Sequence, residues 1–389
     1  MQTVESLTQA VEELLPVIES RRKQTREDRK VPVETVEALR KAGFFRLLQP
    51  KQFGGMEASP DVFFRLQSRI AEACMSTAWG CGIIAVHAYQ VALMDRRAQR
   101  DVFGKDQDTR VSSAYAPVGK VERVEGGFML SGRWGWSSGS AHCTWVLLGA
   151  IVPDDFANNG NSFLHGYRTF LVPQPDYVIG GNWEPMGLQG TGSYDIIIDK
   201  PVFVPDYRTH RQLDGYNCTN PGYDGDESWL YHIPWAQLFA RTVCTPAIGA
   251  TKCALNTFIR NLQKGGNTND ATKKPQDPDV LARIAKAANL IDEVESVLAL
   301  HMKSINEQSM TLIDRVKRRY QTSLVIEKCI QAVDLLYNVS GGMSVFDSEM
   351  RQLWMDIHTA RAHVANNPTA FERNYGNVLM GNPNTDTFI

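Results

Sequence analysis

The spacing of apolar residues changes twice along this 389-residue chain, and these changes limit the fold more than any other feature. Near the N-terminus, Phe63, Leu66 and Ile70 recur at the spacing of one helix face. From about residue 109, short runs rich in β-branched residues are bounded by Gly, Pro and Asp, which is typical of strands. Helical spacing then returns. We therefore expect an N-terminal helical domain (1–108), a middle β-domain (109–222) and a C-terminal helical domain (223–389).

Local breaks in the sequence support this order of elements. Pro32 stands near the start of an expected helix, and Gly43 stands just past its end. Residues 43–55 are expected to form a loop that closes on two glycines. In the middle domain, the pair Gly126-Gly127 lies between two short β-like runs and predicts a hairpin.

The C-terminal domain is expected to contain long antiparallel helices. We interpret Pro246 as the first turn of a helix and residues 265–279 as a polar connector. A helix through residues 324–342 is expected to stop at Gly341-Gly342. An apolar stripe with heptad-like spacing predicts another long helix, and its members are Leu281, Ile284, Ala288, Ile291 and Leu298.

Composition and charge argue against several classes of partner. The formal net charge is −2, which favours neither nucleic acid nor an anionic membrane. No apolar run approaches the roughly 18 residues of a membrane span, and the first residues lack the pattern of a secretory signal. The seven Cys are scattered without a CxxC pair and are expected to be reduced thiols of the core. We therefore expect a cytoplasmic protein.

Two common kinds of site have no signature in the sequence. None of the eight His belongs to an HExxH motif or a Cys/His ligand set. His358 and His363 are five residues apart, a spacing that turns them away from a common helix face. No GxGxxG motif follows an expected strand. We expect neither a metal ion nor a Rossmann site for a nicotinamide nucleotide.

Three features stay open on the residues alone. The segment RWGWSSGSAHCTW (133–145) either fills the core of the β-domain or borders a flat ligand. The segment GLQGTGS (187–193) either requires positive φ or brings backbone N–H groups close to a ligand. His87 lies in a strongly apolar helix and is either a satisfied core residue or a catalytic one.

Seven stretches occur in order from about residue 40 to the C-terminus: GFFRLLQPKQFGG, STAWGCGIIAVHAYQVALMD, RVSSAYAPVGKV, WGWSSGSAHCTWVLLG, GLQGTGSYDIIIDKPVFVPDYR, DLLYNVSGG and DIHTARAHVANNP. Together they resemble the oxygenase components of two-component, flavin-dependent aromatic hydroxylases. That family includes 4-hydroxyphenylacetate 3-hydroxylase and the phenol hydroxylases of bacterial sterol breakdown. The resemblance implies an α+β fold of the acyl-CoA dehydrogenase type, with an N-terminal helical domain, a middle β-barrel or sandwich and a C-terminal four-helix bundle.

The resemblance also implies an activity. The chain would bind reduced FMN or FADH2 made by a separate NAD(P)H:flavin reductase and would use O2 as co-substrate. It would insert one oxygen atom into a small aromatic substrate, a phenol at the ortho position, through a C4a-hydroperoxyflavin. Assembly as a homotetramer is implied as well.

Four residues match catalytic positions of that family. Ser138 matches the serine that hydrogen-bonds the flavin N5, where keeping the proton on N5 would lengthen the lifetime of the hydroperoxyflavin. His363 matches the histidine that supplies a proton to reduced dioxygen. His87 and Ser113 match the substrate side, where they would share the phenol proton and hold the phenol oxygen. Other positions match cofactor contacts, the last two from a neighbouring subunit: Trp136, Ser137, Ser138, Thr191, Gly192, Ser193, Gly341 and Gly342.

The sequence departs from the family pattern at two positions, and other functions remain as alternatives. Ala141 replaces a common Asp and Met355 replaces a common Arg, which puts local salt bridges and substrate preference in doubt. The same chemistry could act on an indole, an amine nitrogen or a thiophene sulfur. An acyl-CoA dehydrogenase is disfavoured because Val364 stands where a catalytic Glu would be. A non-catalytic flavin-binding protein is disfavoured because four polar site positions are retained together.

Overall fold

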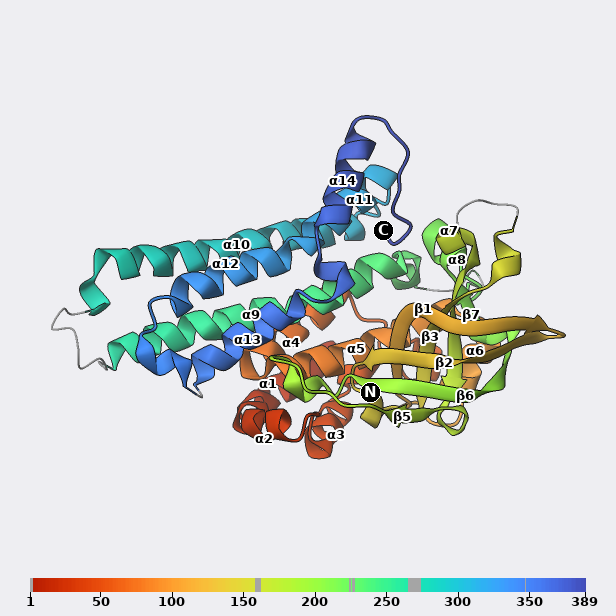
Figure 1. The fold of residues 1–389 in the computed structure, drawn as a ribbon, viewed down its shortest axis with the longest axis horizontal. Helices are drawn as coiled ribbons and strands as arrows, with labels where there is room; N and C mark the ends of the chain where they lie inside the picture. The colour runs from red at the N-terminus through yellow and green to blue at the C-terminus, as the bar shows by residue number, and fades with distance from the viewer. Residues whose placement is uncertain (1–2, 158–161, 224, 226–227, 265–273, 347) are drawn as a thin grey trace.

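The computed structural model describes residues 3–157, 162–223, 225, 228–264, 274–346 and 348–389. Helices build both ends of the chain and strands build the middle, in the order expected from the hydrophobic spacing (Figure 1). The N-terminal helices are α1 (Val4–Ser20), α2 (Arg22–Glu27), α3 (Val33–Lys41), α4 (Pro60–Ala73), α5 (Met75–Leu93) and α6 (Arg96–Phe103). Residues 43–55 hold only short 3-10 turns between bends, which confirms the expected loop.

The middle region is one seven-stranded sheet with the order β5-β6-β2-β1-β3-β4-β7. The first part of β1 pairs in parallel with β3, and its last part pairs antiparallel with β2. The pairing register of β1 with β3 shifts between Ala114 and Gly119. The two halves of the sheet enclose one apolar core, in which the ring centroids of Phe128 and Phe170 lie 5.4 Å apart. The strands are β1 (Val111–Val124), β2 (Gly127–Ser137), β3 (Trp145–Ile151), β4 (Tyr167–Pro173), β5 (Val178–Gly180), β6 (Tyr194–Pro205) and β7 (Thr209–Arg211).

The expected hairpin forms between β1 and β2, one residue earlier than the glycine pair suggests. Val124 pairs with Gly127, so the two turn residues are Glu125 and Gly126. Gly126 has φ of 74°, which suits a residue without a side chain. Gly127 belongs to the strand itself.

The C-terminal region is a bundle of long helices, and two shorter helices, α11 and α14, pack together at one end of it (Figure 1). The contacts among α9, α10, α12 and α13 form a four-helix bundle, and α9 also packs on α4 and α5. The helices after the sheet are α7 (Ser162–Gly166), which lies between β3 and β4, then α8 (Gln212–Asn217), α9 (Trp235–Gln263), α10 (Pro278–Asn306), α11 (Leu312–Ser323), α12 (Val325–Tyr337), α13 (Glu349–Ala360) and α14 (Thr369–Leu379). In the described part of the chain, no helix is long and apolar enough to cross a membrane.

Two expectations for these helices are corrected. Pro246 does not open a helix, because α9 begins at Trp235, directly after its N-cap residue Pro234, and contains Pro246 in its interior. On α10 the apolar stripe runs through Val280, Ala287 and Ile291, whereas Leu281 is 50% exposed. Of the polar connector, residues 265–273 lie outside the described part of the chain. The helix α12 ends before Gly341, whose φ of 82° stops further helical growth.

Pro246 is tolerated because the carbonyl that it leaves unpaired receives another donor. Proline has no N–H, so the carbonyl of Thr242, four residues earlier, loses its helical partner. The Nε2 of Gln67 on α4 donates to this carbonyl at 3.0 Å and to the Ala78 carbonyl of α5 at 3.2 Å. Gln67 is fully buried, and its amide therefore joins α4, α5 and α9 at one point.

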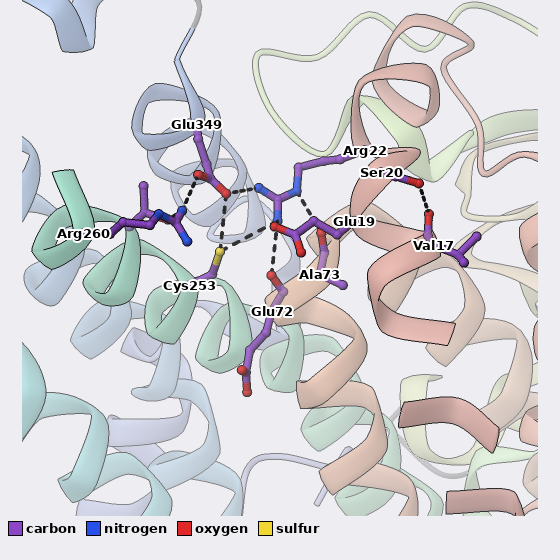
Figure 2. Close-up of polar contacts among 10 residues, drawn as sticks. Val17, Glu19, Ser20, Arg22, Glu72, Ala73, Cys253, Arg260 and Glu349 are labelled. Carbon is purple, nitrogen blue, oxygen red and sulfur yellow. Dashed lines mark hydrogen bonds and ion pairs between the residues drawn. The ribbon is translucent and has the colours of Figure 1, made fainter. Parts of the chain in front are cut away.

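A second polar cluster ties the N-terminal helices to the bundle (Figure 2). Arg22 of α2 donates to the Ala73 carbonyl at 2.8 Å and forms an ion pair with Glu349 of α13. Arg260 of α9 donates to the same carboxylate at 3.0 Å. Because these charge-assisted bonds are partly shielded from water, they hold α2, α9 and α13 together more firmly than a surface pair would.

We predict that Gln67→Met lowers the free energy of unfolding by about 1–3 kcal/mol, because two buried carbonyls lose their donor. The matched background is Pro246→Ala, in which Thr242 regains a backbone donor. There the cost of Gln67→Met should fall by about 1 kcal/mol. Urea unfolding of the four proteins measures this coupling. An equal cost in both backgrounds would show that Gln67 does not compensate for the proline.

Candidate functional site

A cavity of about 710 Å³ lies where the three regions of the chain meet. Trp79 of α5 and Tyr115 of β1 form part of its wall, and Trp235 and Phe239 of α9 form another part. The C-terminal segment 385–389 covers one side, where Phe388 lies 6.1 Å from the Phe239 ring. The wall combines many aromatic rings with several polar side chains, which is the usual character of a site for a flat organic ligand.

The structure brings some of the expected site residues to this cavity and leaves others outside it. Ser113, Trp136, Ser138 and His363 are among the lining residues. The other expected positions are not, and they are His87, Ser137, Thr191, Gly192, Ser193, Gly341 and Gly342. Gly341 and Gly342 lie beyond the end of α12, where a Cβ on Gly342 would meet nothing within 4 Å.

Ser138 is the cavity end of a chain of hydroxyl groups. Its Oγ accepts a hydrogen bond from Trp79 Nε1 at 3.3 Å and lies 2.8 Å from the Oγ of Ser193. The Ser193 hydroxyl lies 2.7 Å from Thr191 Oγ1, which donates to the Leu188 carbonyl at 3.0 Å. Thr191 and Ser193 therefore act from behind the wall, where they fix the position and the hydrogen-bond direction of Ser138.

The Trp-rich segment divides between the core and the cavity. Trp134 is fully buried and donates from Nε1 to the Gly149 carbonyl at 2.8 Å. Trp136 has φ of 67°, is 69% exposed and lines the cavity. Ser137 is buried, and its Oγ has no hydrogen-bond partner in the described part of the chain. Ala141, the first departure from the family pattern, lies on the surface.

The backbone of segment 187–193 packs closely against the backbone of α13 and is hydrogen-bonded to a side chain of that helix. Leu188 has φ of 54°, and its N–H donates to Oδ1 of Asp356 at 2.6 Å. A Cβ on Gly187 would lie 2.2 Å from the Met355 carbonyl oxygen, and Gly192 has φ of 53°. Segment 187–193 thus contains both features expected from its small residues, positive φ and a close backbone approach. The close approach is to the backbone of α13 and not to a ligand. Burial raises the pKa of Asp356 to about 6.

His363 lies at the cavity directly after α13. Its Nδ1 accepts the backbone N–H of Ala365 at 3.1 Å, so this nitrogen carries no hydrogen. Burial, with the positive charge of Arg319 nearby, lowers the pKa of His363 to about 4, so the imidazole is neutral at pH 7. His358 points elsewhere and bonds Asp334 on α12 at 2.9 Å, so the two histidines do not share a face, as their spacing predicts.

His87 lies behind the cavity wall. It is completely buried, with ring centroids 6.0 Å from Tyr115 and 6.2 Å from Trp235. Its Nδ1 lies 2.8 Å from the Val111 carbonyl and must therefore donate to it. Nε2 is left as a buried acceptor that has no partner among the described residues. Burial lowers the pKa of His87 to about 4.

Three charged residues of the cavity wall were not predicted from the sequence. Arg211 of β7, Arg319 of α11 and Asp386 of the C-terminal segment line the cavity. Arg319 is 2% exposed, and its guanidinium lies 3.4 Å from the centroid of the Phe371 ring. Its place in a basic run, Arg315 to Arg319, suggests a solvated face. The signal that could have revealed it is its spacing of three from the buried Val316 on an amphipathic helix.

Searches among known proteins found similar chains of full length. The family model described as "Acyl-CoA dehydrogenase, C-terminal domain" matches residues 241–368. The flavin-dependent monooxygenase oxygenase subunit HsaA of Rhodococcus jostii is 33% identical over 98% of this chain and 100% of its own. The oxygenase component of p-hydroxyphenylacetate 3-hydroxylase of Acinetobacter baumannii is 28% identical over 97% of this chain and 89% of its own.

Solved structures agree with this similarity. The crystal structure of 3-HSA hydroxylase from Rhodococcus sp. RHA1 superimposes with a TM-score of 0.91 at 33% identity, covering 99% of both chains. XiaF from Streptomyces sp. has a TM-score of 0.88 at 21% identity, covering 98% of this chain and 97% of its own. The fold is therefore that of the acyl-CoA dehydrogenases, as the sequence blocks imply.

The buried carboxyl of Asp356 predicts a pH dependence of stability. Its pKa is raised on folding, from about 3.9 for an unperturbed Asp to about 6. The folded state therefore holds the proton more tightly, and this stabilisation is full below pH 4 and is lost as the pH rises through 6. Asp356→Asn keeps an acceptor for Leu188 and Gln352 but has no charge. Relative to this variant, the wild type should lose up to about 3 kcal/mol between pH 4 and pH 7, measured by urea unfolding. A constant difference would contradict the assignment.

Proposed function

Because the chain belongs to the family of flavin-dependent monooxygenase oxygenase subunits, we propose that its substrate is a phenol and that oxygen enters ortho to the hydroxyl group. The observation that carries this proposal is full-length similarity to several hydroxylases, two of which are named for hydroxyphenylacetate and resorcinol. A separate NAD(P)H:flavin reductase supplies the reduced flavin, since the relatives are named as oxygenase subunits or components.

The residues of the cavity suit a reduced flavin. The cavity of about 710 Å³ has aromatic walls, and the Ser138 hydroxyl opens into it from a buried hydroxyl chain. The buried Ser137 Oγ, next in the chain to Ser138, has no hydrogen-bond partner among the described residues and lies behind the cavity wall. When bound, the reduced flavin activates O2 for transfer to the aromatic ring. The cofactor is reduced FMN or FADH2, since a similar resorcinol hydroxylase is named as FADH2-dependent and the similarly folded TdsC was solved with FMN.

Ser138 holds a proton at the flavin N5. Its Oγ already accepts from Trp79 Nε1, and the neighbouring Ser193 hydroxyl is backed by Thr191. A hydroxyl fixed in this way by three groups does not need to reorient when charge develops, which is what makes a preorganised contact effective. Trp136, Ser137, Thr191, Gly192 and Ser193 complete this side of the flavin site.

His87 and Ser113 serve the phenol, and His363 serves the oxygen. His87 presents a neutral Nε2 acceptor, because its Nδ1–H is committed to the Val111 carbonyl. This atom lies behind the cavity wall, so the phenol shares its proton with Nε2 only when the wall opens toward His87. Ser113 lines the cavity and holds the phenol oxygen. His363 faces the cavity with its free donor on Nε2. Loss of the phenol proton raises the electron density of the ortho carbon and so favours its attack on an electrophilic oxygen.

The chain forms a homotetramer in which Gly341 and Gly342 approach the cofactor of a neighbouring subunit. An acyl-CoA dehydrogenase removes an α-proton with a carboxylate; among the described residues no Glu lines the cavity, and the one carboxyl group there is that of Asp386 in the C-terminal segment. Val364, which stands where that Glu would be, is 79% exposed.

We predict that mixing the protein, loaded with reduced FMN or FADH2, with O2 gives a transient absorbance distinct from that of oxidised flavin. Ser138→Ala should shorten its lifetime about 10- to 100-fold, because a hydrogen bond to a charged or developing charge contributes about 1.5–3 kcal/mol. Ser140→Ala is the matched control, since Ser140 is buried in the same loop but does not line the cavity, and it should change the lifetime less. Stopped-flow spectroscopy measures both. Immediate reoxidation of the flavin by the wild type would rule out the mechanism.

We predict that His87→Ala and Ser113→Ala lower the yield of hydroxylated phenol while the transient forms at the wild-type rate. The reason is that both residues act on the substrate and not on O2. Product analysis with phenols, indoles and sulfur heterocycles, run beside the stopped-flow measurement, separates the two steps. Equal loss of both steps would show that His87 is not on the substrate side, and turnover of an indole or thiophene alone would overturn the phenol assignment.

A further inference from the structure

The buried Arg319 has an unusual position for a cation. It is 2% exposed, and in the described part of the chain no ion pair within 4 Å includes it. Its guanidinium stacks on Phe371, and its Nε has no hydrogen-bond partner there. Burial lowers the pKa of Arg319 to about 10, so it remains charged at pH 7. A buried charge without a carboxylate within 4 Å is costly, although the carboxyl group of Asp386 in the same cavity wall acts favourably on it, so its position calls for an explanation.

Arg319 is joined to His363 through a single residue, Ala365, whose carbonyl and N–H lie in two successive peptide units. Its Nη1 donates to the carbonyl of Ala365 at 3.0 Å. The N–H of the same Ala365 donates to Nδ1 of His363 at 3.1 Å. The carbonyl bond to Arg319 restrains the short turn Val364–Asn366 that carries this N–H. Arg319 thus fixes the donor that faces His363.

This arrangement selects one form of the imidazole. With Nδ1 accepting a backbone N–H, the neutral ring must carry its hydrogen on Nε2. Protonation of Nδ1 would place two hydrogens face to face and break the bond to Ala365. The positive charge of Arg319 disfavours the cationic ring as well.

The other groups near His363 are two aromatic rings, one carboxyl group and one exposed arginine. Trp79 of α5 and Phe239 of α9 contribute aromatic rings, each with its centroid 5.9 Å from the imidazole. From the C-terminal segment, Asp386 lines the same cavity, and burial raises the pKa of its carboxyl. Arg361, two residues before His363, is largely exposed and pairs with Glu327. Besides burial, the charge that lowers the pKa of His363 is that of Arg319.

We propose that Arg319 is a positioning residue for the proposed oxygen-side histidine: through Ala365 it holds His363 as the neutral tautomer with the hydrogen on Nε2, ready to donate from that atom. The assignment of a role to His363 rests on the proposed function, but the tautomer and its dependence on Arg319 do not.

The test observes His363 directly in the protein without flavin. The chain is labelled with ¹⁵N-histidine, and the His363 resonances are assigned by their loss in His363→Asn. At pH 7 the ¹⁵N shifts should report a hydrogen on Nε2 in the wild type. In Arg319→Met, the Nδ1 form should become populated, and the pH at which half of His363 is protonated should rise by about one pH unit.

A neighbouring arginine on the same helix supplies a crossed control. Arg318 is also buried, at 4% exposed, but it donates to Gln237 and Ser304 and does not line the cavity. It lies near His301, whose pKa is lowered to about 4 by burial first, with Arg318 among the nearby cations. Arg318→Gln should therefore move the titration of His301 and leave His363 unchanged, whereas Arg319→Met should do the reverse.

Three outcomes would overturn the proposal. They are an unchanged His363 in Arg319→Met, equal movement of both histidines in either variant, or a hydrogen on Nδ1 in the wild type. Arg319→Lys, which keeps the charge, should leave the protonation midpoint near the wild-type value. A full shift in Arg319→Lys would also overturn the electrostatic part. The loaded enzyme offers a separate readout: if wild-type His363 has the expected tautomer but no transient forms with O2, the proposed function fails and the positioning role stands.

Discussion

The burial of α5 on every side is the constraint on which the rest of the structure depends. Every residue from Met75 to Leu93 is buried, so this helix has no solvent face and must be covered by the sheet and by the bundle at once. It packs on β1, α4 and α9. The same helix carries Trp79 into the cavity wall and places His87 directly behind it. The cavity is therefore a consequence of how the two outer regions close over α5.

Closing polar groups into such an interior requires that each be paired, and the pairing defines the site. Gln67 supplies the donor that Pro246 removes from α9, which lets that helix continue beneath the cavity. Asp356 supplies an acceptor for Leu188, which fixes the segment that carries Ser193. Ser193 in turn fixes Ser138. The Ser138 hydroxyl at the cavity surface is thus positioned by Ser193, and the segment that carries Ser193 is fixed by Asp356 of α13. Its position therefore depends on groups that do not line the cavity.

The sequence predicts the fold better than the site, and particular residues show why. Periodicity and breakers locate the three regions, because burial on one face leaves a repeat that can be counted. The same reasoning misplaces the start of α9 at Pro246, because the compensating donor, Gln67, lies 175 residues before the Thr242 carbonyl that it pairs and leaves no local trace. Leu281 is assigned to the buried stripe because Val280 and Leu281 are both apolar, and only packing decides between them. The matched blocks point to Ser138 and His363, but nothing local identifies Arg319 or the C-terminal segment as parts of the cavity.

His87 and His363 illustrate how one physical cause can yield two different functions. Burial keeps both rings neutral, and a protein that used burial alone would make them equivalent. The backbone breaks this equivalence. A carbonyl at Nδ1 of His87 leaves an acceptor at Nε2, while an N–H at Nδ1 of His363 leaves a donor at Nε2. An acceptor suits a group that shares the proton of a phenol, and a donor suits a group that faces developing negative charge on oxygen. The chemical roles thus follow from two single backbone groups, the Val111 carbonyl and the Ala365 amide, and the second of these is held in place by Arg319.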